Sequence, residues 1–182
     1  MKNLSLICLA GLTFTAVFGT LLHFVYGFTG NIAFAPISAV NESTWEHMKI
    51  LFFPMLAFAL LQAKFHAKSV KSFWQIKFYG ISFGLLLVPA LFYTLNGMFG
   101  NYPDWINIGI FFLSAFLAYL LEYFLFKKDY QARLPAFIAV GELVLIGLAF
   151  AVFTFIPPHL PLFQDPVYGG YGIQNINGKT LR

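Results

Sequence analysis

The sequence contains few charged residues. Only 10% of its 182 residues are Asp, Glu, Lys or Arg, against about 25% in ordinary soluble domains. A water-facing surface cannot be built from so small a supply, which excludes an ordinary soluble domain. The single cysteine, Cys8, also excludes an intrachain disulfide. The chain is instead 59% hydrophobic, with 24 Phe residues. These values predict an integral membrane protein whose main partner is the lipid bilayer.

The net charge of +4 does not indicate a nucleic-acid partner. The Lys and Arg residues stand in short clusters between apolar runs, and this arrangement is typical of the bias that orients membrane proteins. The residues on one side are Lys2, Lys64, Lys68, Lys71, Lys77, Lys127, Lys128 and Arg133, and those on the other are Lys49, Lys179 and Arg182. We expect the richer side to be cytoplasmic, with the N-terminus inside and the C-terminus outside.

Five apolar runs are long enough to cross a bilayer as helices, which takes about 20 residues each. We therefore predict an all-α fold, a single transmembrane domain over 1–182 with an extended outer tail at 157–182. The expected helices are about 4–28, 43–63, 75–96, 105–126 and 134–156. The first run is longer than the roughly 7–15 apolar residues of a cleaved signal peptide, so we interpret it as a retained helix.

The segment 41–49 is the densest polar cluster of the chain. Glu42 and Glu46 are four residues apart, and on a helix they lie on one face. Together with His47 they are candidates for general acid and base catalysis. The alternative is structural: Glu46 completes a capping box with Ser43 and pairs with Lys49, and both carboxylates stabilise the start of the helix.

A second candidate group lies in the tail, where four prolines between 157 and 166 stiffen the chain. A stiff tail can hold His159 and Asp165 over the helix ends, and we predict His47, His159 and Asp165 as ligands of a divalent metal ion. The alternative is a rigid exit from the fifth helix with solvated side chains. Residues expected to line the same site are His23, Asn41, Trp45, Asp104, Asn107 and Glu142. The alternative to a site-lining role is a packing role for His23 and a helix-capping role for Asp104.

Two carboxylates lie within predicted helices, where charge is expensive and indicates function by default. We expect Glu122 to reach the cytoplasmic interface and Glu142 to find a partner or stay protonated, with Lys77 as one available base.

Two motifs carry a resemblance to a known family. The first is Asn41-Glu42-Ser43-Thr44-Trp45-Glu46-His47-Met48-Lys49, and the second comprises Pro157-Pro158-His159, Pro161-Leu162-Phe163 and Asp165-Pro166. Over essentially the whole chain, the sequence resembles a family of small uncharacterised bacterial membrane proteins, mainly from Gram-positive bacteria. The resemblance implies a multi-pass protein of the bacterial cell membrane and implies no activity.

Three hypotheses of function follow. The first is an outward-facing polar site that binds a metal ion or a small polar or lipid ligand, with interfacial hydrolysis as its reaction. The second is a transporter or channel subunit that uses Glu122 and Glu142 and needs a homo-oligomer or a partner, because five helices are few. The third is a non-catalytic accessory membrane protein. The sequence does not choose between an enzyme and the other two.

Overall fold

The computed structural model describes residues 3–100 and 103–173. Within them the protein is all-α, and the prediction of five helices long and apolar enough to cross a membrane is confirmed. The helices are α1 (Leu4–Thr29), α2 (Thr44–His66), α3 (Phe73–Phe99), α4 (Trp105–Lys127) and α5 (Ala136–Phe155). Two short 3₁₀ helices, η1 (Ile32–Phe34) and η2 (Pro161–Phe163), lie in the irregular segments.

The start of α2 shows how local sequence determines a helix boundary. Ser43 has an extended backbone, and its hydroxyl accepts a hydrogen bond from the Glu46 amide at 3.4 Å. This is half of the expected capping box. The other half is absent, because the Ser43 amide donates to the Asn41 side chain at 2.8 Å. The Glu46 carboxylate is thereby left free for another partner.

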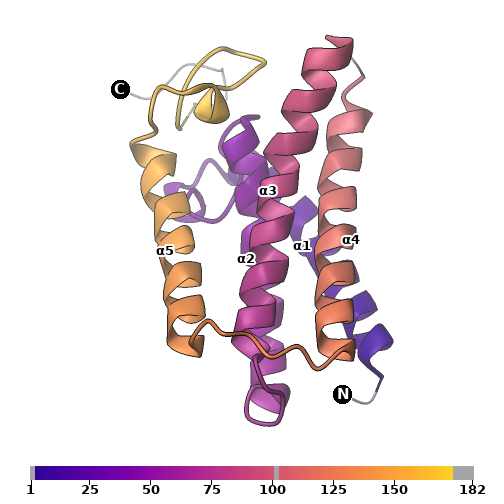
Figure 1. The fold of residues 1–182 in the computed structure, drawn as a ribbon. Helices are drawn as coiled ribbons and strands as arrows, with labels where there is room; N and C mark the ends of the chain where they lie inside the picture. Colours follow the sequence, from indigo (N-terminus) through magenta and orange to yellow (C-terminus); the bar gives the residue numbers. More distant parts are fainter. Residues whose placement is uncertain (1–2, 101–102, 174–182) are drawn as a thin grey trace.

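The helices run alternately up and down (Figure 1). α3 and α4 form an antiparallel pair, α1 packs against α2 and α4, and α5 packs against α3 and α2. The core between them is built from buried apolar residues of α2, α3, α4 and α5, including Leu51, Ile81, Ala118 and Leu143. The connection at 128–135 crosses the lower end of α3 (Figure 1), where the Ser72 hydroxyl accepts from the Ala132 amide at 3.0 Å.

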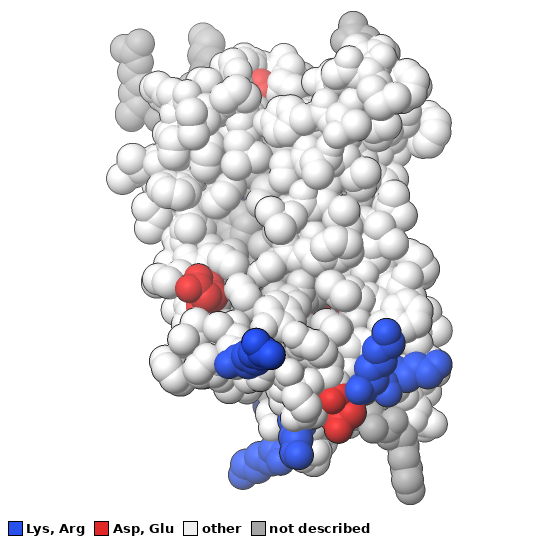
Figure 2. All heavy atoms as spheres, viewed as in Figure 1, with Lys and Arg blue, Asp and Glu red and all other residues white. Residues whose placement is uncertain are grey.

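The two ends of the bundle differ in charge. We call the end with the α2–α3 and α4–α5 connections the basic end, since Lys64, Lys68, Lys71 and Arg133 are exposed there. Figure 2 shows Lys and Arg gathered at this end, below a largely uncharged wall. The opposite end, which carries the segments 30–43 and 157–173, is called the loop end. Lys2, Lys179 and Arg182, which also supported the predicted orientation, lie outside the described residues.

Near the basic end, Lys77 of α3 and Glu122 of α4 form a buried ion pair. Their side chains are 2% and 1% exposed, and Nζ lies 2.6 Å from Oε2. The rings of Phe58, Phe73, Tyr119 and Phe126 surround the ammonium at 5.6–5.9 Å from their centroids. The expectation that Glu122 reaches the interface is therefore wrong, because Lys77 offers a partner inside the bundle.

Candidate functional site

Three side chains from separate parts of the sequence meet at the loop end. The Glu42 Oε2 atom lies 3.6 Å from Nε2 of His23 and 3.6 Å from Nε2 of His47. The three ligand atoms all lie within 4.8 Å of one another. In the part of the chain that the structure describes, this is the one group of His, Cys, Asp or Glu with the spacing of a metal site.

His47 occupies the first turn of α2, and its tautomer follows from its hydrogen bond. Nδ1 lies 2.9 Å from the Ser43 carbonyl oxygen. A carbonyl only accepts, so Nδ1 carries a proton, and the neutral imidazole then presents the lone pair of Nε2 toward Glu42. Histidines that bind metals characteristically have their second ring nitrogen oriented in this way.

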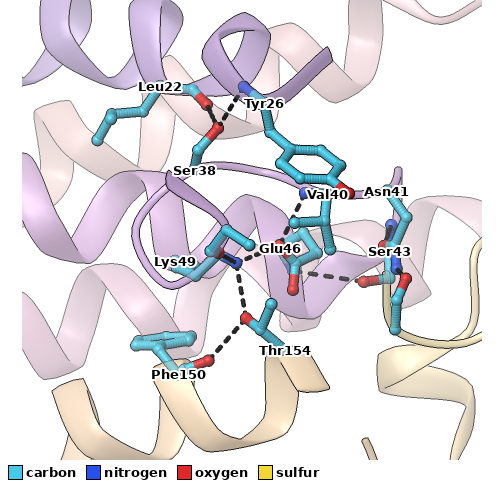
Figure 3. A network of polar contacts seen from close by, with 12 residues as sticks. Leu22, Tyr26, Ser38, Val40, Asn41, Ser43, Glu46, Lys49, Phe150 and Thr154 are labelled. Carbon is cyan, nitrogen blue, oxygen red and sulfur yellow. Dashed lines mark hydrogen bonds and ion pairs between the residues drawn. The ribbon is translucent and has the colours of Figure 1, made fainter. Parts of the chain in front are cut away.

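Ser38 attaches a loop to the turn of α1 that carries His23. The Ser38 hydroxyl donates to the Leu22 carbonyl at 2.6 Å and accepts from the Tyr26 amide at 3.0 Å. These two backbone groups are the pair that would bond in an uninterrupted helix, so Ser38 bridges them (Figure 3). The Ala39 amide also donates to the Leu22 carbonyl, at 3.2 Å. The segment 30–43 is therefore attached to the turn of α1 that carries His23.

Glu42 lies near the end of this segment, two residues before α2, and the tail holds its backbone. Its amide donates to Asp165 Oδ2 at 3.5 Å. The adjacent Asn41 donates through Nδ2 to the Gly172 carbonyl at 2.8 Å. Asp165 is 1% exposed, and its other oxygen accepts from the Val167 amide at 2.7 Å. Asp165 thus organises the tail and the backbone at Glu42 and does not join the cluster.

Glu46 and Lys49 form a second buried ion pair at this end, with side chains 2% and 0% exposed. The Glu46 carboxylate also accepts from the Val40 amide at 3.1 Å. The Lys49 ammonium donates to the Ala35 carbonyl and to the Thr154 hydroxyl, both at 2.8 Å. Figure 3 shows this network joining the segment 30–43 to α2 and α5. Glu46 is therefore bound to Lys49 and to the Val40 amide and is not a member of the cluster of His23, Glu42 and His47.

Aromatic packing attaches the tail to the bundle. Trp45 of α2 lies 4.5 Å from the Phe150 ring of α5, 5.7 Å from Phe153 and 4.7 Å from Phe163 of η2, measured between centroids. Gly172 adopts φ +67°, and an added Cβ there would lie 3.2 Å from Pro157. This close approach explains the need for glycine where the tail folds back. The two sequence motifs are therefore in direct contact.

The structure places the other predicted site residues elsewhere. His159 is exposed and stacks on Tyr171 at 4.6 Å between ring centroids, outside the cluster. Asp104 is exposed, and its side chain does not cap α4. Asn107 is half-buried in the first turn of α4. Glu142 is exposed in the half of α5 nearer the basic end, away from the loop end.

Two groups that build the site have no signal in the sequence. Ser38 lies in a small-residue segment without a motif. Lys49, in contrast, stands three residues after Glu46 and forms the ion pair expected from the sequence. Thr154 carries no sequence signal, since only the packing of α5 against α2 brings its hydroxyl to the ammonium.

Comparison with known proteins gives one match. A family model described as "Family of unknown function (DUF6512)" matches residues 1–173. No curated protein matches, and no solved structure does. Since the matched residues make up nearly the whole chain, the protein belongs to this family.

Proposed function

For this member of a family without a known activity, we propose a divalent metal site built by His23, Glu42 and His47, facing the outside of the membrane. The observation that carries the proposal is the pair of 3.6 Å separations between Glu42 Oε2 and the two imidazole Nε2 atoms. Zinc bound tetrahedrally at about 2.0–2.1 Å separates its ligand atoms by about 3.3–3.4 Å. Two of the three separations are therefore close to the spacing that a bound ion would impose, and the two imidazole nitrogens lie within 4.8 Å of each other.

The donor set supports a borderline first-row metal, with zinc as the first expectation. Two imidazoles and one carboxylate suit Zn²⁺ and also Fe²⁺, and they do not suit Mg²⁺ or Ca²⁺, which prefer oxygen ligands. Three protein ligands leave a coordination position for water or substrate, as in catalytic zinc sites. Glu42 is 44% exposed, so solvent reaches the cluster. Hydrolysis by metal-bound water, at the membrane surface, is the reaction class that we propose for such a site.

The positive-inside tendency supports the outward orientation. The exposed Lys and Arg of the described helical connections lie at the basic end, and the cluster lies at the loop end. Proteins place such basic connections in the cytoplasm. A transport role receives less support, because Glu122 is paired with Lys77 and Glu142 is exposed rather than buried inside the bundle.

Metal analysis of the purified protein tests the proposal. We expect one zinc ion per chain after loading with Zn²⁺ and removal of excess metal. His23→Ala and His47→Ala should each weaken binding by more than about 10–100-fold, the usual cost of losing a hydrogen-bond partner of a ligand. Binding should also weaken as the pH falls, because imidazole binds metal only in its neutral form.

His66→Ala is a matched control on the same helix. Like His47, His66 has its Nδ1 atom close to the carbonyl oxygen four residues earlier, here at 3.3 Å. Unlike His47, it lies at the basic end. We expect His66→Ala and His159→Ala to keep the wild-type metal content. An equal zinc content in the wild type and all variants would exclude the site. Loss of zinc in His159→Ala alone would show that the metal binds at the tail.

A further inference from the structure

The exposed face of α5 combines apolar side chains with one carboxylate. The buried residues of α5 are Ala139, Leu143, Phe150 and Thr154, which form a stripe against α3 and α2. The residues turned away from the bundle include Phe137, Leu145 and Leu148, which are 76%, 60% and 56% exposed. Glu142 is also exposed, and it lies one turn from Leu145 on the helix. A lipid-facing wall would be expected to be apolar throughout.

Glu142 lies within the membrane-spanning part of α5. It is the seventh residue of a 20-residue helix, about 9 Å along the axis from the first. The helix has the highest mean hydropathy of the five spans, 2.5. Its length matches the hydrocarbon thickness with little to spare. A glutamate side chain is shorter than the Lys and Arg side chains that extend from such depths to water.

Carboxylates inside membranes almost always face the bundle interior and pair there, as Glu122 does with Lys77 at 2.6 Å. Among the described residues, no ion pair or hydrogen bond reaches Glu142. Both carboxylates thus lie in apolar helices, but Glu122 is buried and paired whereas Glu142 is exposed. An intramembrane acid that faces outward with no partner of its own calls for a cation from another molecule.

A second copy of the chain does not supply that cation. The two lysines well inside the described spans, Lys49 and Lys77, are 0% and 2% exposed and already paired. The other described Lys and Arg residues lie in the last turn of a helix or in the connections at the basic end. Two copies that met through α5 would place one Glu142 carboxylate against the other.

We propose that this face of α5 docks a transmembrane helix of a different membrane protein, one that carries a Lys or Arg opposite Glu142. The apolar residues around Glu142 supply the packing surface. The carboxylate supplies the specificity, because an unpaired charge on either helix disfavours separation in lipid. The partner is defined by a single basic residue about a third of the way into its span, on the side of the basic end.

Energy transfer between labelled helices in lipid vesicles tests the docking. The probe is a leucine-rich model helix with one Lys at that depth, compared with the same helix without Lys. Interhelical polar contacts in membranes suggest about 3- to 15-fold tighter association of the Lys helix with the whole protein. Glu142→Leu should remove this difference. Since the residue is exposed to lipid, the variant should fold as the wild type does.

A relocation experiment separates a specific contact from general attraction. In Glu142→Leu combined with Leu145→Glu, the carboxylate moves one turn along the exposed face. The variant should then associate most tightly with a model helix whose Lys is shifted by three residues. Equal association of the Lys and Leu helices with the wild type would overturn the proposal. Energy transfer between two copies of the protein that depends on Glu142 would also overturn it, in favour of a homodimer.

Discussion

The two buried ion pairs stand at opposite ends of the bundle and serve different neighbours. At the loop end, Glu46 and Lys49 also bind the Val40 amide, the Ala35 carbonyl and the Thr154 hydroxyl. At the basic end, Lys77 is surrounded by aromatic rings, and Glu122 Oε1 is buried without a hydrogen-bond partner. The first pair stabilises irregular backbone, whereas the second joins regular helices.

The difference follows from what each region has to satisfy. Helices pair their own backbone groups, but a buried irregular segment leaves amides and carbonyls that need partners. The segment 30–43 is of this kind, and the loop-end pair supplies both a donor and an acceptor to it. We therefore expect the two pairs to respond differently when they are removed.

The largest effect is expected from Lys49→Met. The substitution leaves the Glu46 carboxylate buried without its cation and the Ala35 carbonyl without its donor. Breaking one side of a buried pair costs about 3–5 kcal/mol. Thermal unfolding in detergent micelles should show this loss of stability, and zinc binding at the neighbouring cluster should fall with it. A stability within 1 kcal/mol of the wild type, on the scale of ordinary surface substitutions, would contradict the role given to the network.

Replacing both members of each pair sharpens the comparison. Lys77→Met with Glu122→Met should leave stability within about 1 kcal/mol of the wild type, because apolar replacement of a buried pair is often neutral or better. Lys49→Met with Glu46→Met should remain less stable by about 2 kcal/mol or more, since each buried backbone group left without a partner costs about 1–3 kcal/mol. The free energies of unfolding of the two double variants are measured side by side. Equal losses of stability would contradict the difference that we infer between the two pairs.

A smaller effect is expected from Ser38→Ala, which removes the bridge between the Leu22 carbonyl and the Tyr26 amide. The loss of one hydroxyl should cost about 1 kcal/mol of stability. Because the bridge lies beside His23, zinc affinity should fall by about 10-fold. Ser69→Ala is the control, since the exposed Ser69 bonds the His66 carbonyl at 3.2 Å near the basic end. Unchanged zinc affinity in Ser38→Ala would show that the bridge does not position His23.

The fold followed closely from composition and hydropathy. The first helix was expected at about 4–28 and lies at Leu4–Thr29, and the fourth was expected at about 105–126 and lies at Trp105–Lys127. α3 begins two residues earlier and ends three residues later than expected, since polar residues at its ends obscured its limits. Length and apolarity carry such strong signals because a span must exclude water along its whole length.

The candidate site followed only in part. Glu42 and His47 were singled out, and His23 was considered as a lining residue, but their meeting depends on how the segment 30–43 folds back on α1. Ser38 decides that contact through two hydrogen bonds to backbone atoms. Glu46 was a catalytic candidate as well, but it pairs with Lys49, as the structural alternative predicted, and its carboxylate accepts from the Val40 amide.

By itself, then, the sequence determined the class, the number of spans and the polar segment at 41–49, because these depend on local composition and on the bilayer's demand for apolar helices. Only the tertiary structure decided that Glu122 is buried against Lys77, that Glu142 is exposed, and that His23 meets Glu42 and His47. Glu122 and Glu142 illustrate the point: both are single acids in apolar helices, and one is buried against Lys77 while the other is exposed. The helix face that packing covers, rather than the residue type, makes that distinction.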